Sequence, residues 1–178
     1  MKRCLSGIFG IILFISAHAQ SESELDFIQS VGFSYYTNFL SSYPAIHYQP
    51  RLNFWEISSK AAVSLDVRFA GGYFEQNDSK AEEHYPIFDI PVSVNYNYGC
   101  AATRVSSKRI GYYGGIGWNT QIAYGEYLLF GPLANAGFRF DIDDKSPIDI
   151  NAGFMVDISG NYTNEFMVGI QYVFGMLK

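Results

Sequence analysis

Apolar residues occupy every second position in the segment Glu165–Phe174, which reads EFMVGIQYVF. One face of this segment carries large apolar side chains throughout, those of Phe166, Val168, Ile170, Tyr172 and Phe174. The other face is smaller and more mixed, with Met167, Gly169, Gln171 and Val173. A period of two residues is that of a β-strand, whose successive side chains point to opposite faces. The apolar face must therefore be covered, either by a protein core or by lipid.

Seven earlier segments alternate in the same way, at residues 25–38, 45–57, 61–74, 87–99, 109–124, 132–142 and 148–158. Most of these strands are about 10 to 14 residues long, enough for a tilted strand to cross a bilayer. The connections between them are compatible with hairpins, including the turn sequence DDKSP at residues 143–147. We therefore predict an all-β fold, an eight-stranded antiparallel up-and-down barrel. Its closing strand pairs with residues 25–38, which leaves no free sheet edge.

The N-terminal sequence MKRCLSGIFGIILFISAHAQ has a basic start, an apolar run and small residues at Ala17 and Ala19. This is the pattern of a secretory signal peptide, so we expect residues 1–19 to be removed and residues 20–178 to form the barrel domain. Cys100 is then the one remaining cysteine, and no intramolecular disulfide can form. The net charge of −5 argues against a nucleic-acid partner. No motif calls for a metal or another cofactor.

In mid-strand the apolar rows carry no charge, and the charged residues fall on the opposite row. They are Arg51, Asp66, Arg68, Asp89, Arg139, Asp141, Asp149 and Asp157. A soluble barrel places its polar row outside, whereas a membrane barrel places it inside. One arginine on a lipid-facing row would cost about 2–4 kcal/mol at mid-membrane, which explains rows free of charge. We therefore predict a membrane barrel whose lumen is filled by an ion-pair network of these residues.

Aromatic residues on the apolar rows gather towards strand ends, as they do in interfacial girdles. They include Tyr48, Tyr73, Tyr96, Tyr98, Trp118, Tyr124, Tyr172 and Phe174. Together with FDIPVSVNYNYG from Phe88, IGYYGGIGW from Ile110 and the aromatic-ended last strand, this pattern resembles the small outer-membrane β-barrel family. That family includes OmpA-like transmembrane domains and the related porin-family barrel domain.

The resemblance implies a location in the outer membrane, with contact to its lipid and lipopolysaccharide. It also implies insertion by the barrel-assembly machinery, for which the closing strand serves as the signal. We expect a monomer with both termini in the periplasm and with the connections at residues 39–44, 75–86, 125–131 and 159–164 outside the cell. A lumen of eight strands is filled by its own side chains, so a general diffusion pore is not expected.

Three functions follow as hypotheses. The first is a non-enzymatic barrel that contributes to envelope structure or surface interaction. Its longest polar loop contains Glu75, Asp78, Glu82 and Glu83, which would bind lipopolysaccharide through divalent cations. The second is a barrel enzyme acting on lipid A or phospholipid, in which His47 meets Ser64 and Asp66 from the adjacent strand. The third is a secreted soluble barrel that binds a small apolar ligand.

Overall fold

The computed structural model describes residues 26–37, 42–78, 81–123, 127–142, 147–160 and 164–175. The predicted signal peptide, residues 1–19, lies outside them. The strands are β1 (Asp26–Thr37), β2 (Ser42–Ser58), β3 (Ala61–Val67), β4 (Phe69–Asp78), β5 (Ala81–Asp89), β6 (Val92–Gly99), β7 (Ile110–Ala123), β8 (Tyr127–Asp141), β9 (Pro147–Met155) and β10 (Glu165–Phe174). The described residues contain no helix long and apolar enough to cross a membrane.

These ten segments form the eight strands of a barrel, because two long strands are each interrupted once. β3 and β4 are separated at Arg68, and β5 and β6 at Ile90 and Pro91. Proline has no N–H to donate to the ladder, so pairing is broken at Pro91. The Arg68 N–H nevertheless donates to the Pro91 carbonyl at 2.9 Å, which holds the two interruptions side by side. The prediction of eight strands is therefore confirmed.

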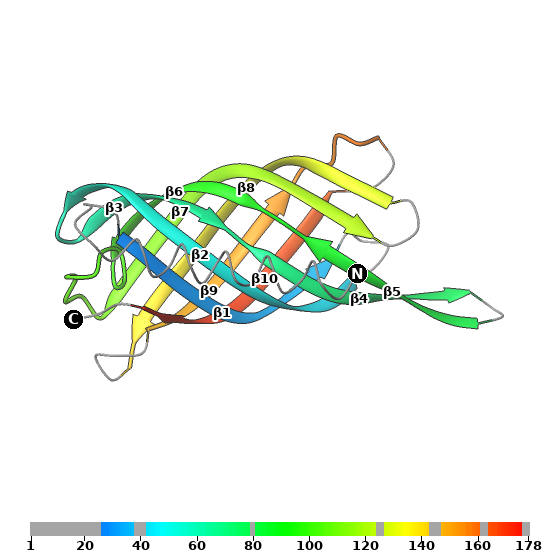
Figure 1. Ribbon diagram of the computed structural model, residues 1–178, viewed down its shortest axis with the longest axis horizontal. Helices are drawn as coiled ribbons and strands as arrows, with labels where there is room; N and C mark the ends of the chain where they lie inside the picture. The colour runs from blue at the N-terminus through cyan, green and yellow to red at the C-terminus, as the bar shows by residue number, and fades with distance from the viewer. Residues whose placement is uncertain are drawn as a thin grey trace, which may run out of the picture.

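The barrel closes where β1 meets β10, as predicted. Their antiparallel register runs from Gln29 opposite Phe174 to Thr37 opposite Phe166. β1 also pairs along its whole length with β2, and β10 pairs with β9. Every neighbouring pair of strands is antiparallel, and the tilted strands wind around a single lumen in Figure 1.

The apolar rows point outwards and the polar rows point inwards. Ile116 is 74% exposed and Phe33 64%, whereas Asn95 and Asp149 on the opposite row are fully buried. On the closing strand Phe166, Val168, Ile170 and Tyr172 are exposed, while Gln171 faces inwards and is buried. This confirms the predicted phase. It contradicts the hypothesis of a soluble barrel with an apolar cavity, because such a barrel needs the reverse arrangement.

Glycines on the inner face make room for larger neighbours. A Cβ atom on Gly137 would collide with the ring of Tyr113, its cross-strand partner. A Cβ atom on Gly115 would collide with the Asn95 side chain from β6. The narrow lumen therefore alternates residues without a side chain with residues that fill it.

One predicted connection is wrong. Residues 75–86 are predicted as a polar loop, but their described backbone continues β4 and β5 as a ladder up to Asp78 opposite Ala81. Residues 100–109 do form a turn between β6 and β7, in which Cys100, Ala101, Ala102 and Thr103 are each at most 2% exposed. The connections at 39–44 and 125–131 are shorter than predicted, since β2 begins at Ser42 and β8 at Tyr127, whereas the one at 159–164 is longer, since β9 ends at Met155.

The phase can be tested with single cysteines in a Cys100→Ser background. We expect a fluorophore on Val92→Cys to be quenched by brominated acyl chains in lipid vesicles, because Val92 points outwards. The same fluorophore on Ser93→Cys should remain unquenched, because Ser93 is 5% exposed and faces the lumen. Quenching at Ser93 and not at Val92 would reverse the assignment.

Candidate functional site

The lumen is the candidate functional region, because six of the eight predicted charged residues meet there. They are Arg51, Asp66, Arg68, Asp89, Arg139 and Asp149, each at most 5% exposed. The pleat turns them inwards from five strands and from the break at Arg68. They form three groups along the barrel axis.

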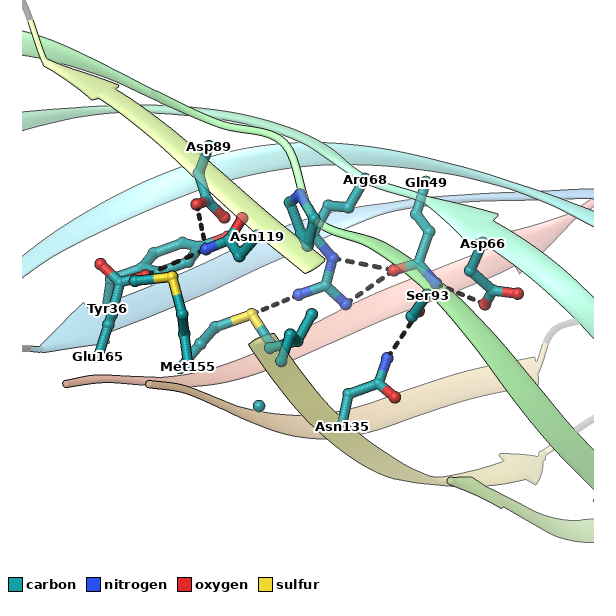
Figure 2. A pocket seen from close by; sticks show the side chains of 14 residues that line it. Tyr36, Gln49, Asp66, Arg68, Asp89, Ser93, Asn119, Asn135, Met155 and Glu165 are labelled. Atoms are coloured by element: carbon teal, nitrogen blue, oxygen red, sulfur yellow. Dashed lines mark hydrogen bonds between the residues drawn. The ribbon is translucent and has the colours of Figure 1, made fainter. Parts of the chain in front are cut away.

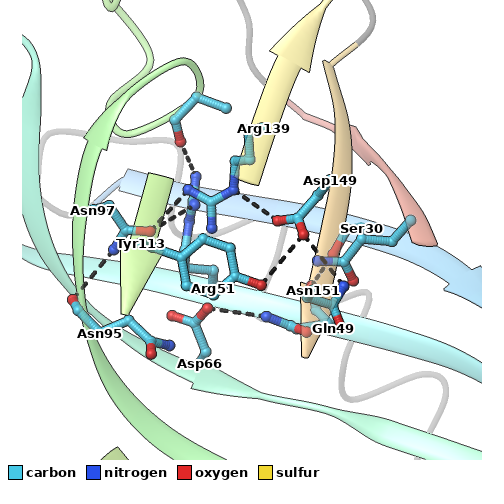
Figure 3. Close-up of polar contacts among 12 residues, drawn as sticks. Ser30, Gln49, Arg51, Asp66, Asn95, Asn97, Tyr113, Arg139, Asp149 and Asn151 are labelled. Carbon is cyan, nitrogen blue, oxygen red and sulfur yellow. Dashed lines mark hydrogen bonds and ion pairs between the residues drawn. The ribbon is translucent and has the colours of Figure 1, made fainter. Parts of the chain in front are cut away.

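The first group surrounds Arg139, which lies opposite Asp149 in the β8–β9 register. Arg139 Nε donates to Asp149 Oδ2 at 2.8 Å in an ion pair that is almost fully buried. The guanidinium group lies over the Tyr113 ring, 4.1 Å from its centroid, and Nη1 donates to Asn97 Oδ1 at 2.8 Å. The Tyr113 hydroxyl donates to Asp149 Oδ1, so the pair and its neighbours form one network across the lumen (Figure 3).

Arg51 joins this network to the segment that fills one end of the barrel. Its Nη1 donates to Asn97 Oδ1 at 3.2 Å, and its Nη2 donates to the Ala101 carbonyl. Asn53 Nδ2 donates to the Ala102 carbonyl at 2.9 Å. These inward side chains satisfy backbone carbonyls that would otherwise be buried without a donor. Residues 100–106 thus form a plug, a name kept below for this segment.

The second group is built on Gln49, which separates Arg68 from Asp66. Gln49 Oε1 accepts hydrogen bonds from Arg68 Nε at 2.9 Å and from Nη2 at 2.7 Å. Gln49 Nε2 donates to Asp66 Oδ2 at 3.0 Å. The Gln49 amide therefore links Arg68 to Asp66. Each charged group is stabilised by its hydrogen bond to this amide and not by direct contact with the other charge.

The third group contains Asp89 and a residue that the sequence interpretation missed, Glu165. Asn119 Nδ2 donates to Asp89 Oδ1 at 2.7 Å and approaches Glu165 Oε1 at 3.5 Å. Gln121 Nε2 donates to Glu165 Oε2 at 2.5 Å. Glu165 is 3% exposed and begins the inward row that continues with Met167. The alternation of the closing strand already places Glu165 on the inward row with Met167. The predicted lumen charges do not include it, because Glu165 is the first residue of that strand.

The structure does not bring Asp141 and Asp157 into these groups. Both are partly exposed and lie at strand ends. The Asp157 carboxylate accepts a hydrogen bond from the Ser159 N–H at 2.8 Å, which fixes the turn after β9.

The predicted contact of His47 with Ser64 and Asp66 is wrong. In the register, His47 lies opposite Ala70, while Ser64 and Asp66 lie opposite Asn53 and Arg51. His47 Nδ1 instead pairs with Ser34 Oγ at 2.8 Å, and Nε2 with Gln171 Oε1 at 2.8 Å. Its side chain is 1% exposed, so no lipid can reach it from outside the barrel.

The acidic residues Glu75, Asp78, Glu82 and Glu83 lie on the backbone ladder of β4 and β5, but their side chains fall outside the described part of the structure. Among the side chains that are described, no three from His, Cys, Asp or Glu gather in one place. A cation site among the described side chains would therefore need amide or hydroxyl ligands as well as carboxylates.

Little empty space is left in the lumen. The cavity beside Arg68 and Asp89 has a volume of about 20 Å³, and the cavity beside Arg51 and Asp149 about 10 Å³. Each is close to the smallest volume that holds one water molecule. The side chains therefore close the lumen against the passage of larger solutes.

The buried ion pair can be tested by removing one partner. Arg139→Met leaves Asp149 charged without its cation, which should lower the free energy of unfolding by about 3–5 kcal/mol. Adding Asp149→Asn should restore much of that loss. Urea unfolding in detergent micelles, followed by tryptophan fluorescence, measures both. Lys108→Gln, an exposed position, serves as the control, and an equal loss there would contradict the assignment.

No protein-family model matches this sequence, and no curated protein matches it either. Solved structures do share its fold. Ail, the attachment invasion locus protein of Yersinia pestis, aligns with a TM-score of 0.55 and 15% identity over 85% of this chain and 100% of Ail. Neisserial surface protein A aligns with a TM-score of 0.54 and 10% identity over 85% of this chain and 98% of its own.

The outer membrane enzyme PagL aligns with a TM-score of 0.51 and 12% identity, over 82% of this chain and 97% of PagL. An adhesion-related protein, a surface protein and an enzyme thus share this architecture, so the likeness concerns the fold alone. With its closed β1–β10 seam, apolar exterior and filled polar lumen, the chain has the fold of the small eight-stranded outer-membrane β-barrels.

Proposed function

We propose that this protein is a non-enzymatic, non-conducting outer-membrane barrel that anchors a surface hairpin. The observation that carries the proposal is the combination of an apolar exterior with a lumen closed by side chains. Ile46 and Ile116 are more than 60% exposed, whereas Arg139 and Asn97 inside are buried. Exposed apolar rows on every strand require lipid, and a filled lumen carries no solute.

The proposed orientation places both termini in the periplasm. The start of β1, the end of β10 and the plug share one end of the barrel in Figure 1. The hairpin of β4 and β5 projects from the opposite end. If the N-terminal segment is a signal peptide, the first end faces the periplasm and the hairpin faces the outside.

The projecting hairpin is the proposed interaction element. β4 pairs with β2 only as far as Gly72, and β5 pairs with β7 only from Ile87. Residues 73–78 and 81–86 therefore pair with each other beyond the barrel wall, as a two-stranded ribbon. Its sequence includes Glu75, Asp78, Glu82 and Glu83, which supports binding of lipopolysaccharide through divalent cations.

The one Ser–His contact among the described residues is buried in the lumen, and this burial argues against the enzymatic alternative. PagL is an enzyme with the same fold, but the Ser34–His47 contact here is buried in the lumen with an amide as the third group. A lipid-acting nucleophile must be accessible to lipid. We propose that His47 packs the lumen, that the barrel is a monomer, and that the barrel-assembly machinery inserts it.

The anchoring role is tested by electrophoresis and bilayer recording. We expect the detergent-extracted protein to migrate faster unheated than boiled, and to give no steady conductance in planar bilayers. Full solubility in buffer without a heat-dependent shift would refute the membrane assignment, and a stable open channel would refute the closed lumen.

The hairpin is tested by neutralising its acids. The variant Glu75→Gln, Asp78→Asn, Glu82→Gln, Glu83→Gln should lose the Ca²⁺-dependent part of its binding to lipopolysaccharide micelles, because the bridging carboxylates are gone. Fluorescence titration with and without EDTA measures it. The control, Glu56→Gln with Asp141→Asn, changes charge near the other barrel end and should bind like the parent. Equal Ca²⁺ dependence in all three proteins would contradict the proposal.

A further inference from the structure

Two carboxylates are buried together inside the barrel without an ion pair, although the charge of Arg68 acts on Asp89. Asp89 is 1% and Glu165 3% exposed, and the Asn119 amide lies between them. Arg68 borders the same cavity, but it donates to Gln49, Asn151 and Met167 instead. In Figure 2 dashed lines join its guanidinium group to Gln49, and none joins it to Asp89.

Among the described residues, the lumen as a whole also contains more buried acids than buried arginines. The fully buried charged residues described are three arginines and four acids: Arg51, Arg68, Arg139, Asp66, Asp89, Asp149 and Glu165. Arg139 neutralises Asp149, Arg68 is linked to Asp66 through Gln49, and Arg51 borders both. Adjacent buried carboxylates that are both charged repel each other strongly, so either a proton or a bound cation must offset the charge.

Unpartnered oxygens face the cavity beside these carboxylates. Asp89 Oδ2, Asn119 Oδ1 and the Tyr36 hydroxyl are buried with no partner at hydrogen-bond distance, although the Tyr36 hydroxyl and the Asp89 carboxylate interact with each other, and all three residues line the cavity with Glu165. The cavity volume of about 20 Å³ accommodates a single small ligand. Buried polar atoms without partners are rare in folded proteins, so this concentration points to a ligand that supplies them.

We propose that a hard cation, of which Ca²⁺ is the test case, binds in this cavity between Asp89 and Glu165. The ligands offered are carboxylate, amide and hydroxyl oxygens, the set preferred by Ca²⁺, Mg²⁺ and Mn²⁺ over softer metals. A water molecule would fill the same space, but one of the two carboxyl groups would then have to be protonated.

Neighbouring residues hold the carboxylates in position for this cation. Gln121 Nε2 and the Tyr43 hydroxyl both contact Glu165 Oε2, while Asn119 Nδ2 holds Asp89 Oδ1. Asp89 Oδ2 is thereby left for the ligand, together with Glu165 Oε1, which contacts Asn119 Nδ2 at 3.5 Å. Glu165 is the first residue of β10, at the end of the barrel from which the hairpin projects. The cation would thus enter from that end, through the mouth of the lumen.

The test is terbium luminescence in detergent micelles free of lipopolysaccharide. The four hairpin acids are neutralised as above, so that the lumen site is measured alone. Tb³⁺ replaces Ca²⁺ and is excited through nearby tyrosines, among them Tyr36 and Tyr43. We expect saturable luminescence that Ca²⁺ displaces. Glu165→Gln and Asp89→Asn should each weaken Tb³⁺ binding at least about tenfold, a change of 1.4 kcal/mol in binding free energy.

Asp141→Asn removes the same charge at the other end of the barrel and should leave the luminescence unchanged. Absence of saturable Tb³⁺ binding, or equal binding by all variants, would overturn the proposal and assign the cavity to water. Because the hairpin acids are absent from this background, the result is independent of the proposed surface function.

Thermal stability gives a second readout that does not depend on Tb³⁺. In EDTA, Glu165→Gln should melt at a higher temperature than the parent, because one of two repelling charges is gone. Ca²⁺ should raise the melting temperature of the parent and not of this variant. If Glu165→Gln fails to fold, Asp89→Asn replaces it in the same comparison. A parent that is insensitive to Ca²⁺ would overturn the proposal.

Discussion

The closed hydrogen-bond ladder is the constraint on which the rest of this structure depends. In hydrocarbon, an unpaired N–H or C=O group costs several kcal/mol, so a sheet that crosses a membrane cannot keep a free edge. The pairing of β1 with β10 removes that edge by joining residues at least 129 positions apart, from Thr37 opposite Phe166 (166 − 37 = 129) onwards. Its register then fixes which side chains meet in the lumen. Even the break at Pro91 is compensated, since its carbonyl accepts the Arg68 N–H.

The eight strands enclose a narrow lumen that side chains must fill. In this lumen, small residues lie opposite large ones. Gly137 receives the Tyr113 ring, and that ring in turn supports the Arg139 guanidinium group. Polar side chains are suited to this space because amides such as Gln49 and Asn97 connect charges that do not touch. The filled lumen is therefore specified by its hydrogen bonds, and the cavities beside Arg68 and Arg51 are each close to the smallest volume that holds one water molecule.

Alternation in the sequence was sufficient to predict the strand number, the closing pair and the inward or outward phase, because each is a property of period two and of burial. Contacts across the lumen were not predictable, because they depend on register. His47 meets Ser34 and Gln171 and not Ser64, since the register of β2 places His47 opposite Ala70, whereas Ser64 lies opposite Asn53. The plug was missed for a different reason: local composition at residues 100–103 contains no signal that the segment turns inwards.

Glu165 illustrates both what the alternation predicts, its row, and what it does not predict, its contacts across the lumen. Its row followed from the alternation, but its partner Asp89 comes from a strand that is not its neighbour, so their proximity arises only when the barrel closes. Closure thus creates a local excess of negative charge that no single strand contains. A barrel wall free of charge needs every ionisable group inside, and one more acid than arginine is buried in the described lumen. The same constraint that seals the sheet therefore concentrates the uncompensated charge beside the cavity, where a cation would neutralise it.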